Sequence, residues 1–281
     1  MTPQDERARL WVRPMAAKKP PRSETAETIR FLLKLALGTL LLRTFVVSAF
    51  VIPSQSMLPR LLIGDYLFVT KWNYGYSRWS LPWGWPLIPG HPLARLPARG
   101  DVVVFRSPGP DDHDVIKRVI GLPGDTIQVV HGGLILNGRA VPKTRVADFT
   151  LPLTPNFGAD KCGAVFQEVD ARGGATCRYP RYRETLPGGR SYFVLDQSDV
   201  PDADDTGLYT VPAGTVFLMG DNRDDSADSR FPAPKGMGYI PVERIEGRAA
   251  VTFFSNDGAA SIYNPLSWLS GQRWHRVGEG F

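Results

Sequence analysis

The sequence predicts a mainly β protein: an antiparallel β domain with a β-rich insertion, preceded by one transmembrane helix near the amino terminus. Three observations support this fold class. The 281 residues include 28 glycines and 25 prolines, spread along the chain as turns between short strands require. After residue 52, short runs rich in β-branched and aromatic residues alternate with turn signals. Residues 31–52 alone form an apolar segment long enough to cross a bilayer.

The apolar segment 31–52 has 22 positions, and only Lys34 and Arg43 among them are charged. A helix of this length spans roughly 30 Å, the thickness of a bilayer's hydrocarbon core. Lys34 lies near one end and can extend to the interface, whereas a central Arg43 is costly. We predict a transmembrane helix over residues 28–52. Two alternatives remain open: a cleaved signal peptide, because Val47 and Ala49 form a small-residue pair, and an amphipathic helix at the membrane surface.

The residues before this segment are basic. Residues 1–26 contain six lysines and arginines against three acidic residues. Under the positive-inside rule, this balance predicts that residues 1–27 are a cytoplasmic tail and residues 53–281 are extracytoplasmic. The rest of the chain has no basic run interleaved with stacking aromatics, so we expect no nucleic-acid partner.

The two cysteines, Cys162 and Cys177, have no histidine or cysteine neighbours at metal-ligand spacing. If the domain lies outside the cytoplasm, they are predicted to form a disulfide. If it lies inside, they are two thiols.

Strand-like runs follow residue 52. The first are 65–71, 101–106 and 114–120, and later ones are 215–219 and 248–254. The sequences His131-Gly132-Gly133 and Asn137-Gly138 predict hairpin turns. The insertion is expected at about 128–212. Its residues 144–210 are polar and predicted to be irregular, apart from strand-like pieces at 191–195 and 208–211.

A Pro-rich stretch contains Trp79, Trp83, Trp85, Leu87 and Ile88. Its proline and glycine density predicts a loop, because a long helix does not tolerate them. The aromatic residues belong either to the core or to a bilayer interface, and the sequence leaves both open.

A local signature for Ser-His-Asp catalysis is missing, because none of the four histidines lies near a Gly-x-Ser-x-Gly elbow. A serine hydrolase can instead use a lysine base that an apolar site keeps neutral. Lys117 fits this role because apolar residues flank it in a predicted strand. Ser54 and Ser56 lie between prolines directly after the apolar segment. Taken singly, Lys117 is also consistent with a solvent-facing lysine, and the serines with a polar linker.

Five segments in this order resemble the bacterial type I signal peptidases, a family of Ser/Lys endopeptidases, and they extend over residues 53–230. They are Ser54-Gln55-Ser56-Met57 with Pro59, Gly64-Asp65 through Lys71, Arg99 through Phe105, Ile116-Lys117-Arg118 with Gly121 through Asp125, and Gly220-Asp221-Asn222-Arg223 with Ser226, Asp228, Ser229 and Arg230. Two positions depart from the family pattern: Arg60 replaces a usual threonine and Val115 a frequent tyrosine.

The resemblance implies a membrane-bound serine endopeptidase of the bacterial cytoplasmic membrane. Such an enzyme removes signal peptides from exported preproteins after Ala-x-Ala sites. Ser56 is then the nucleophile and Lys117 the base, and the Ser54 hydroxyl and Ser56 N–H form the oxyanion hole. Supporting residues would be Ser226, Asp228 and Arg230. Substrate contacts would come from Ile52, Pro53, Met57, Val115 and Ile116. No metal or organic cofactor is expected.

Three other functions are weighed against this one. A self-cleaving Ser/Lys protease of the repressor type is soluble and carries a DNA-binding domain, where this chain has an apolar segment. A conjugation-linked processing peptidase is closer to this sequence than the repressor type and is harder to exclude. A membrane-tethered binding module without activity belongs to a different class, and the intact Ser56 and Lys117 argue against it.

Overall fold

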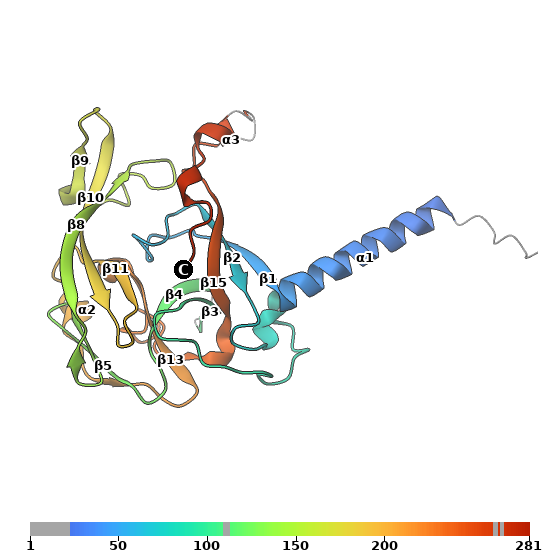
Figure 1. Cartoon of the computed structure of the whole chain (residues 1–281), viewed down its shortest axis with the longest axis horizontal. Coiled ribbons are helices and arrows are strands. Elements are labelled where there is room, and N and C mark those ends of the chain that lie inside the picture. Colours follow the sequence, from blue (N-terminus) through green and yellow to red (C-terminus); the bar gives the residue numbers. More distant parts are fainter. Residues whose placement is uncertain (1–22, 109–112, 261–263, 265–266) are drawn as a thin grey trace, which may run out of the picture. The chain divides into compact units, whose positions relative to one another are not determined.

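The computed structural model describes residues 23–108, 113–260, 264 and 267–281 (Figure 1). The chain divides into two compact units, residues 1–40 and 41–281. Most of the predicted cytoplasmic tail, residues 1–22, lies outside the described residues.

The amino-terminal helix α1 comprises Glu24–Phe45. Its first turn is acidic and its last turn contains Arg43, the charge order that the helix dipole favours. Many of its leucine and phenylalanine side chains are exposed.

The prediction of a helix through residue 52 is wrong, because β1 comprises Val47–Val51 and pairs antiparallel with β2, Asp65–Thr70. Pairing with β2, the next strand along the chain, satisfies the backbone groups of these residues and outweighs their local apolar pattern. The helix that remains contains Arg30, Lys34 and Arg43. Among the described residues, no helix combines the length and the apolar character that crossing a membrane requires.

The main sheet has seven strands in the order β1-β2-β15-β3-β4-β13-β14, and each neighbouring pair is antiparallel. Its remaining strands are β3 Val102–Arg106, β4 Asp114–Gly121, β13 Thr215–Met219, β14 Ile240–Pro241 and β15 Ile245–Ser255. Side chains on a strand alternate between the two faces. Val104 accordingly packs into one buried cluster, and Val103 and Phe105 into another. The sheet is therefore buried on both faces at β3.

Residues 126–210 supply two further antiparallel sheets, as expected for a β-rich insertion. One contains β12-β5-β6-β7, and the other contains β11-β10-β8 with β9 beside β10. The bounds are β5 Thr126–Val130, β6 Gly133–Leu136, β7 Arg139–Ala140, β8 Lys143–Pro152, β9 Gln167–Val169, β10 Ala175–Thr185, β11 Ser191–Leu195 and β12 Tyr209–Thr210. Two one-turn helices are α2 Pro201–Asp204 and α3 Ser267–Ser270.

Both predicted hairpin turns are confirmed. His131 and Gly132 have φ of 47° and 68°, and Asn137 and Gly138 have φ of 51° and 72°, as two-residue turns between twisted strands require. The expectation that residues 144–210 are largely irregular is wrong for the long strands β8 and β10. Most β8 side chains are exposed or half-buried, so this strand lacks the apolar alternation by which strands are recognised.

The tryptophan-rich stretch forms a loop with two short 3-10 turns, η1 Arg78–Ser80 and η2 Pro82–Gly84. Trp83 is 79% exposed and Leu87 is 70% exposed. A core position is therefore excluded for these two side chains. Trp79 is half-buried, and the guanidinium of Arg78 stacks on its ring at 4.8 Å.

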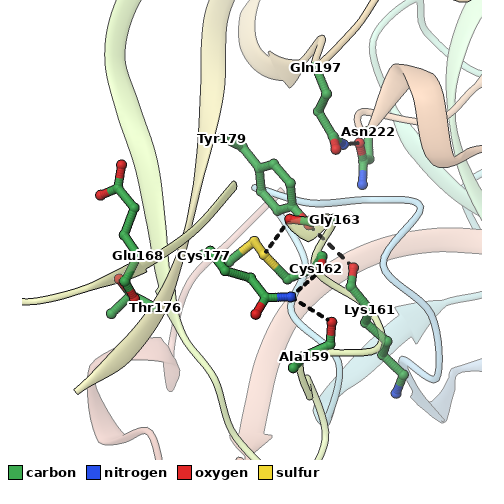
Figure 2. The surroundings of a disulfide bond; sticks show 11 residues. Ala159, Lys161, Cys162, Gly163, Glu168, Thr176, Cys177, Tyr179, Gln197 and Asn222 are labelled. Carbon is green, nitrogen blue, oxygen red and sulfur yellow. Dashed lines mark hydrogen bonds between the residues drawn. A yellow bond between two sulfur atoms is a disulfide. The ribbon is translucent and has the colours of Figure 1, made fainter. Parts of the chain in front are cut away.

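The predicted disulfide between Cys162 and Cys177 is present (Figure 2). It joins the loop before β9 to β10, and the Tyr179 hydroxyl beside it donates a hydrogen bond to the Lys161 carbonyl at 3.3 Å. Both cysteines pack in one buried cluster with Leu58 and Leu62. The disulfide thus lies against the segment that follows Ser56.

Candidate active site

The segment Pro53–Gly64, the serine loop, connects β1 to β2. Its ends are joined where the Ile52 N–H donates to the Asp65 carbonyl at 2.8 Å and the Gly64 N–H to the Ile52 carbonyl at 2.9 Å. Met57, Leu58 and Leu61 within it are completely buried. This apolar anchoring fixes a loop that would otherwise be free to move.

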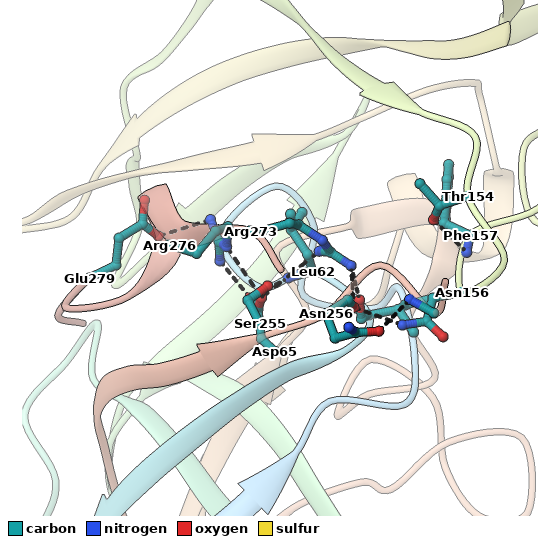
Figure 3. Close-up of polar contacts among 12 residues, drawn as sticks. Leu62, Asp65, Thr154, Asn156, Phe157, Ser255, Asn256, Arg273, Arg276 and Glu279 are labelled. Atoms are coloured by element: carbon teal, nitrogen blue, oxygen red, sulfur yellow. Dashed lines mark hydrogen bonds and ion pairs between the residues drawn. The ribbon is translucent and has the colours of Figure 1, made fainter. Parts of the chain in front are cut away.

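Asp65 ties the serine loop to the carboxyl-terminal part of the chain (Figure 3). Its carboxylate accepts hydrogen bonds from the Leu62 N–H at 2.8 Å and the Ser255 hydroxyl at 2.7 Å. The buried Arg276 guanidinium forms an ion pair with it at 2.5 Å. A buried carboxylate is stable only with such partners, so Asp65 holds three distant segments in one arrangement.

Ser56 and Lys117 come together although 61 residues separate them. Lys117 Nζ lies 2.6 Å from Ser56 Oγ, in direct hydrogen-bonding contact. Ser56 is 7% exposed and Lys117 is 3% exposed. Lys117 lies on β4, an interior strand of the main sheet, and is paired with Val103 of β3, so rigid elements define its position.

Burial lowers the pKa of Lys117 to about 8, because removal from water disfavours the charged ammonium. The carboxylates of Asp228, Asp221 and Asp225 act in the opposite direction and raise this pKa. The desolvation effect is the larger one. An appreciable fraction of Lys117 is therefore neutral near pH 8 and able to accept a proton.

Ser54 lies at the surface beside the same contact, with its hydroxyl 3.4 Å from Ser56 Oγ. The Ser54 side chain is exposed, whereas that of Ser56 is buried. A reacting group that enters from solvent can therefore reach the Ser54 hydroxyl before it reaches Ser56.

The segment Gly220–Arg230, the 220–230 loop, follows β13 and lies against the serine loop. Gly220 is required by close approach, because a Cβ there would come within 2.3 Å of Ser226 Oγ and 2.6 Å of the Ser56 carbonyl oxygen. Asp228 accepts hydrogen bonds from the Gly220 N–H at 2.9 Å and from Arg230 Nε at 2.9 Å. Burial alone would raise the pKa of Asp228, but Arg230 and these hydrogen bonds hold it below its usual range.

Ser226 is buried in this loop, and its Oγ has no hydrogen-bonding partner of normal geometry among the described residues. It lies near enough to Asp228 to help lower the pKa of that carboxyl. No hydrogen bond joins Ser226 to Lys117 within the described part of the chain.

Two contacts of the 220–230 loop had no predicted role. The Asn222 N–H donates to the Ser56 carbonyl at 3.1 Å, and the Asn222 side-chain amide donates to the Gln55 carbonyl at 3.2 Å. The Arg118 guanidinium binds the Asp221 carboxylate through two hydrogen bonds of 2.7 and 2.6 Å. These residues lie in the segments that carry the family resemblance. Their contacts join positions more than 100 residues apart, so no local sequence pattern predicts them.

The five predicted substrate contacts differ in exposure. Met57 is completely buried, so it presents no surface to a substrate in this arrangement, and its substrate contact stays a prediction. Ile52 and Ile116 belong to the same cluster and keep only a few per cent of their surface exposed. Pro53 is exposed and Val115 is half-buried. Ile52 and Pro53 also line a cavity of about 480 Å³ with Tyr66, Phe254 and Trp268.

The carboxylates of Asp196, Asp204 and Asp224 lie within 4.8 Å of one another. The Lys143 ammonium already forms an ion pair with Asp196. The Lys143 ammonium therefore already balances part of the negative charge of the three carboxylates.

Comparison with known proteins identifies the family of this chain. Residues 25–254 match the family model described as signal peptidase, peptidase S26. Proteins named signal peptidase I from Rickettsia typhi and Rickettsia akari are each 35% identical over 255 residues, covering 85% of this chain and 87% and 86% of theirs. A solved signal peptidase I from Enterococcus faecalis aligns with 25% identity and a TM-score of 0.28, covering 55% of this chain and 97% of that one. On the family match and the Rickettsia relatives, this chain belongs to the bacterial type I signal peptidase family and is a serine endopeptidase.

Proposed function

We propose that this chain cleaves signal peptides from exported preproteins, with Ser56 as the nucleophile and Lys117 as the general base. The observation that carries the proposal is the 2.6 Å contact between Lys117 Nζ and Ser56 Oγ, with both side chains buried. A nucleophile within hydrogen-bond reach of a base of lowered pKa is the arrangement that activates a serine hydroxyl.

In the proposed reaction, neutral Lys117 accepts the Ser56 proton as Ser56 Oγ attacks the scissile carbonyl carbon. The carbonyl oxygen becomes an oxyanion, stabilised by the Ser54 hydroxyl and the Ser56 N–H. The C–N bond then breaks, and the Lys117 ammonium returns its proton to the departing amine. Lys117 then deprotonates a water molecule that attacks the acyl carbon. The bond between that carbon and Ser56 Oγ breaks, and the Lys117 ammonium returns the proton to Oγ, which regenerates Ser56 and neutral Lys117.

The 220–230 loop is proposed to position the base. Asp228 and Arg230 brace the loop through their buried ion pair, and Ser226 is proposed to orient the Lys117 amine when substrate is bound. Asn222 belongs to the same support, since its two hydrogen bonds reach the serine loop.

Activity is expected to rise with pH, because only neutral Lys117 accepts a proton. With a pKa of about 8, the neutral fraction grows roughly fifty-fold between pH 6 and pH 8 and levels off above pH 9. We expect kcat/KM for a signal-peptide substrate to follow this curve, while circular dichroism confirms that the enzyme stays folded. A flat profile from pH 6 to 9 contradicts a lysine base.

Cleavage is proposed to require small side chains at the first and third positions before the scissile bond. Ile52, Pro53, Val115 and Ile116 would form the apolar walls that exclude bulk. The test compares a preprotein ending its signal peptide in Ala-x-Ala with a version carrying phenylalanine at the last position. We expect phenylalanine to lower kcat/KM roughly 10- to 100-fold. Equal cleavage of both substrates refutes the specificity, and no cleavage of either by wild type refutes the function.

We also propose that α1 anchors the chain in the cytoplasmic membrane as a single pass, with the basic residues 1–27 inside. Because α1 contains Arg30, Lys34 and Arg43, this proposal requires those three side chains to extend to the headgroup regions. The exposed leucine and phenylalanine side chains of α1 support this, as does the basic flank.

In intact cells, a membrane-impermeant maleimide is expected to label a cysteine introduced at the exposed Ser270 (Ser270→Cys). The unsubstituted chain should not be labelled, because Cys162 and Cys177 are bonded to each other and buried. Labelling only after the membrane is permeabilised would place residues 53–281 in the cytoplasm and overturn the topology.

A further inference from the structure

A second cavity, which Ser56 does not line, lies between the main sheet and the sheet that contains β8, β10 and β11. Its volume is about 470 Å³, within the range of small-molecule sites. Among the described residues that line it, the charged ones are five arginines and one glutamate: Arg60, Arg118, Arg181, Arg190, Arg276 and Glu279. The positive charge therefore exceeds the negative charge on the cavity wall.

Aromatic rings hold three of these guanidiniums in place. Arg60 stacks over Phe281 at 5.0 Å, Arg118 over Tyr192 at 4.3 Å and Arg181 over Phe193 at 4.8 Å. A guanidinium that stacks through its face keeps its N–H groups at the edge, where they can bind an anion through two parallel hydrogen bonds. The cavity wall therefore presents guanidinium N–H donors in fixed positions beside the apolar faces of aromatic rings.

The arginines differ in how their charge is balanced. Arg118, Arg190 and Arg276 form ion pairs of 2.6, 2.6 and 2.5 Å with Asp221, Asp101 and Asp65, none of which lines the cavity. Arg60 and Arg181 form no ion pair with any carboxylate of the described residues. Their hydrogen bonds go to backbone carbonyls, those of Gly280 and Ala147.

The surroundings of Arg60 oppose its charge. Burial lowers the pKa of Arg60, and the nearby guanidiniums of Arg118 and Arg276 lower it further, while Glu279 acts in the opposite direction. An anion in the cavity would relieve this repulsion and supply the acceptors that Arg60 and Arg181 lack.

We propose that this cavity binds a phosphate ester through Arg60 and Arg181. A phosphate group has several acceptor oxygens and can engage more than one guanidinium at once. The aromatic rings provide an apolar wall for the organic part of the ligand. Neither residue of the Ser56–Lys117 contact lines this cavity, so a ligand bound there would not occupy the proposed catalytic contact.

The test measures binding to the full chain in detergent by isothermal titration calorimetry. The soluble probe is glycerol 3-phosphate. The lipid probe is dihexanoyl phosphatidylglycerol, compared with zwitterionic dihexanoyl phosphatidylcholine of the same tail length. The variants are Arg60→Gln and Arg181→Gln. Arg183→Gln is the matched control. Arg183 lies on β10 like Arg181 and stacks on the same Phe193 ring, at 5.4 Å, but it does not line the cavity.

We expect each cavity variant to weaken binding of an anionic probe about tenfold or more, as loss of a charged hydrogen bond does, and Arg183→Gln to leave it unchanged. If the cavity variants weaken the binding of glycerol 3-phosphate, the ligand is a soluble phosphate ester. If they weaken only the binding of phosphatidylglycerol, the ligand is a lipid headgroup.

Absence of binding by both anionic probes overturns the proposal, and so does equal weakening by Arg183→Gln. Arg60→Lys and Arg181→Lys serve if a glutamine variant fails to fold. They keep the charge but lose the paired donors, so intermediate affinity supports the site and wild-type affinity contradicts the role of the guanidinium.

Discussion

Replacing Lys117 by arginine is expected to abolish peptide cleavage while the protein stays folded. A guanidinium keeps its proton at any working pH, so the variant retains the charge of a protonated lysine but has no base. Ser56→Ala should fail equally, because it removes the nucleophile. The double variant Ser56→Ala with Lys117→Ala should be no worse than either single one, since residues that act as a unit are not additive.

The measurement is kcat/KM on a purified preprotein, with thermal unfolding as the check on folding. Lys143→Arg is the matched control: Lys143 is a half-buried lysine, but it pairs with Asp196 away from Ser56, and its variant should cleave at the wild-type rate. More than trace activity in Lys117→Arg rules out Lys117 as the base.

Ser54→Ala is expected to lower kcat roughly 10²–10³-fold with little change in KM. This is the typical loss when one donor of an oxyanion hole is removed, and an unchanged KM means that the lost contact forms only in the transition state. Ser54 is exposed, so no stability change should accompany the substitution.

Ser54→Thr keeps a hydroxyl at the same position and should retain more activity than Ser54→Ala. Ser270→Ala, a change at another exposed serine, should have no effect. If Ser54→Ala retains the wild-type kcat, the Ser54 hydroxyl is not an oxyanion-hole donor and Ser54 is a linker residue.

Several features followed from local pattern. The glycine-containing turns at residues 131–132 and 137–138 were predicted because a two-residue hairpin needs positive φ at both positions. The strands around Val103 and Lys117 were predicted because they are apolar, β-branched and bounded by turn residues. Ser56, Lys117 and the 220–230 loop were singled out because their segments occur in a recognisable order.

Other features required partners that are distant in sequence. Residues 47–51 are as apolar as the helix before them, and only their pairing with β2 makes them a strand. The strands β8 and β10 pair with each other, but β8 has no buried side chain, so its hydrophobic pattern is weak. The buried ion pairs of Asp65 with Arg276 and of Arg118 with Asp221 join residues more than 100 positions apart.

The sequence by itself determined the mainly β class, the candidate Ser/Lys chemistry and the family, because these depend on residue types within short segments. Tertiary structure alone decided where the helix ends, that Met57 is core, that the Ser56 and Lys117 side chains meet at 2.6 Å, and that arginines from several segments line one cavity. Burial lowers the pKa of Lys117, and burial is a property of the packed chain. A lysine in the sequence shows only that a base is available, whereas the surrounding fold makes it neutral enough to act.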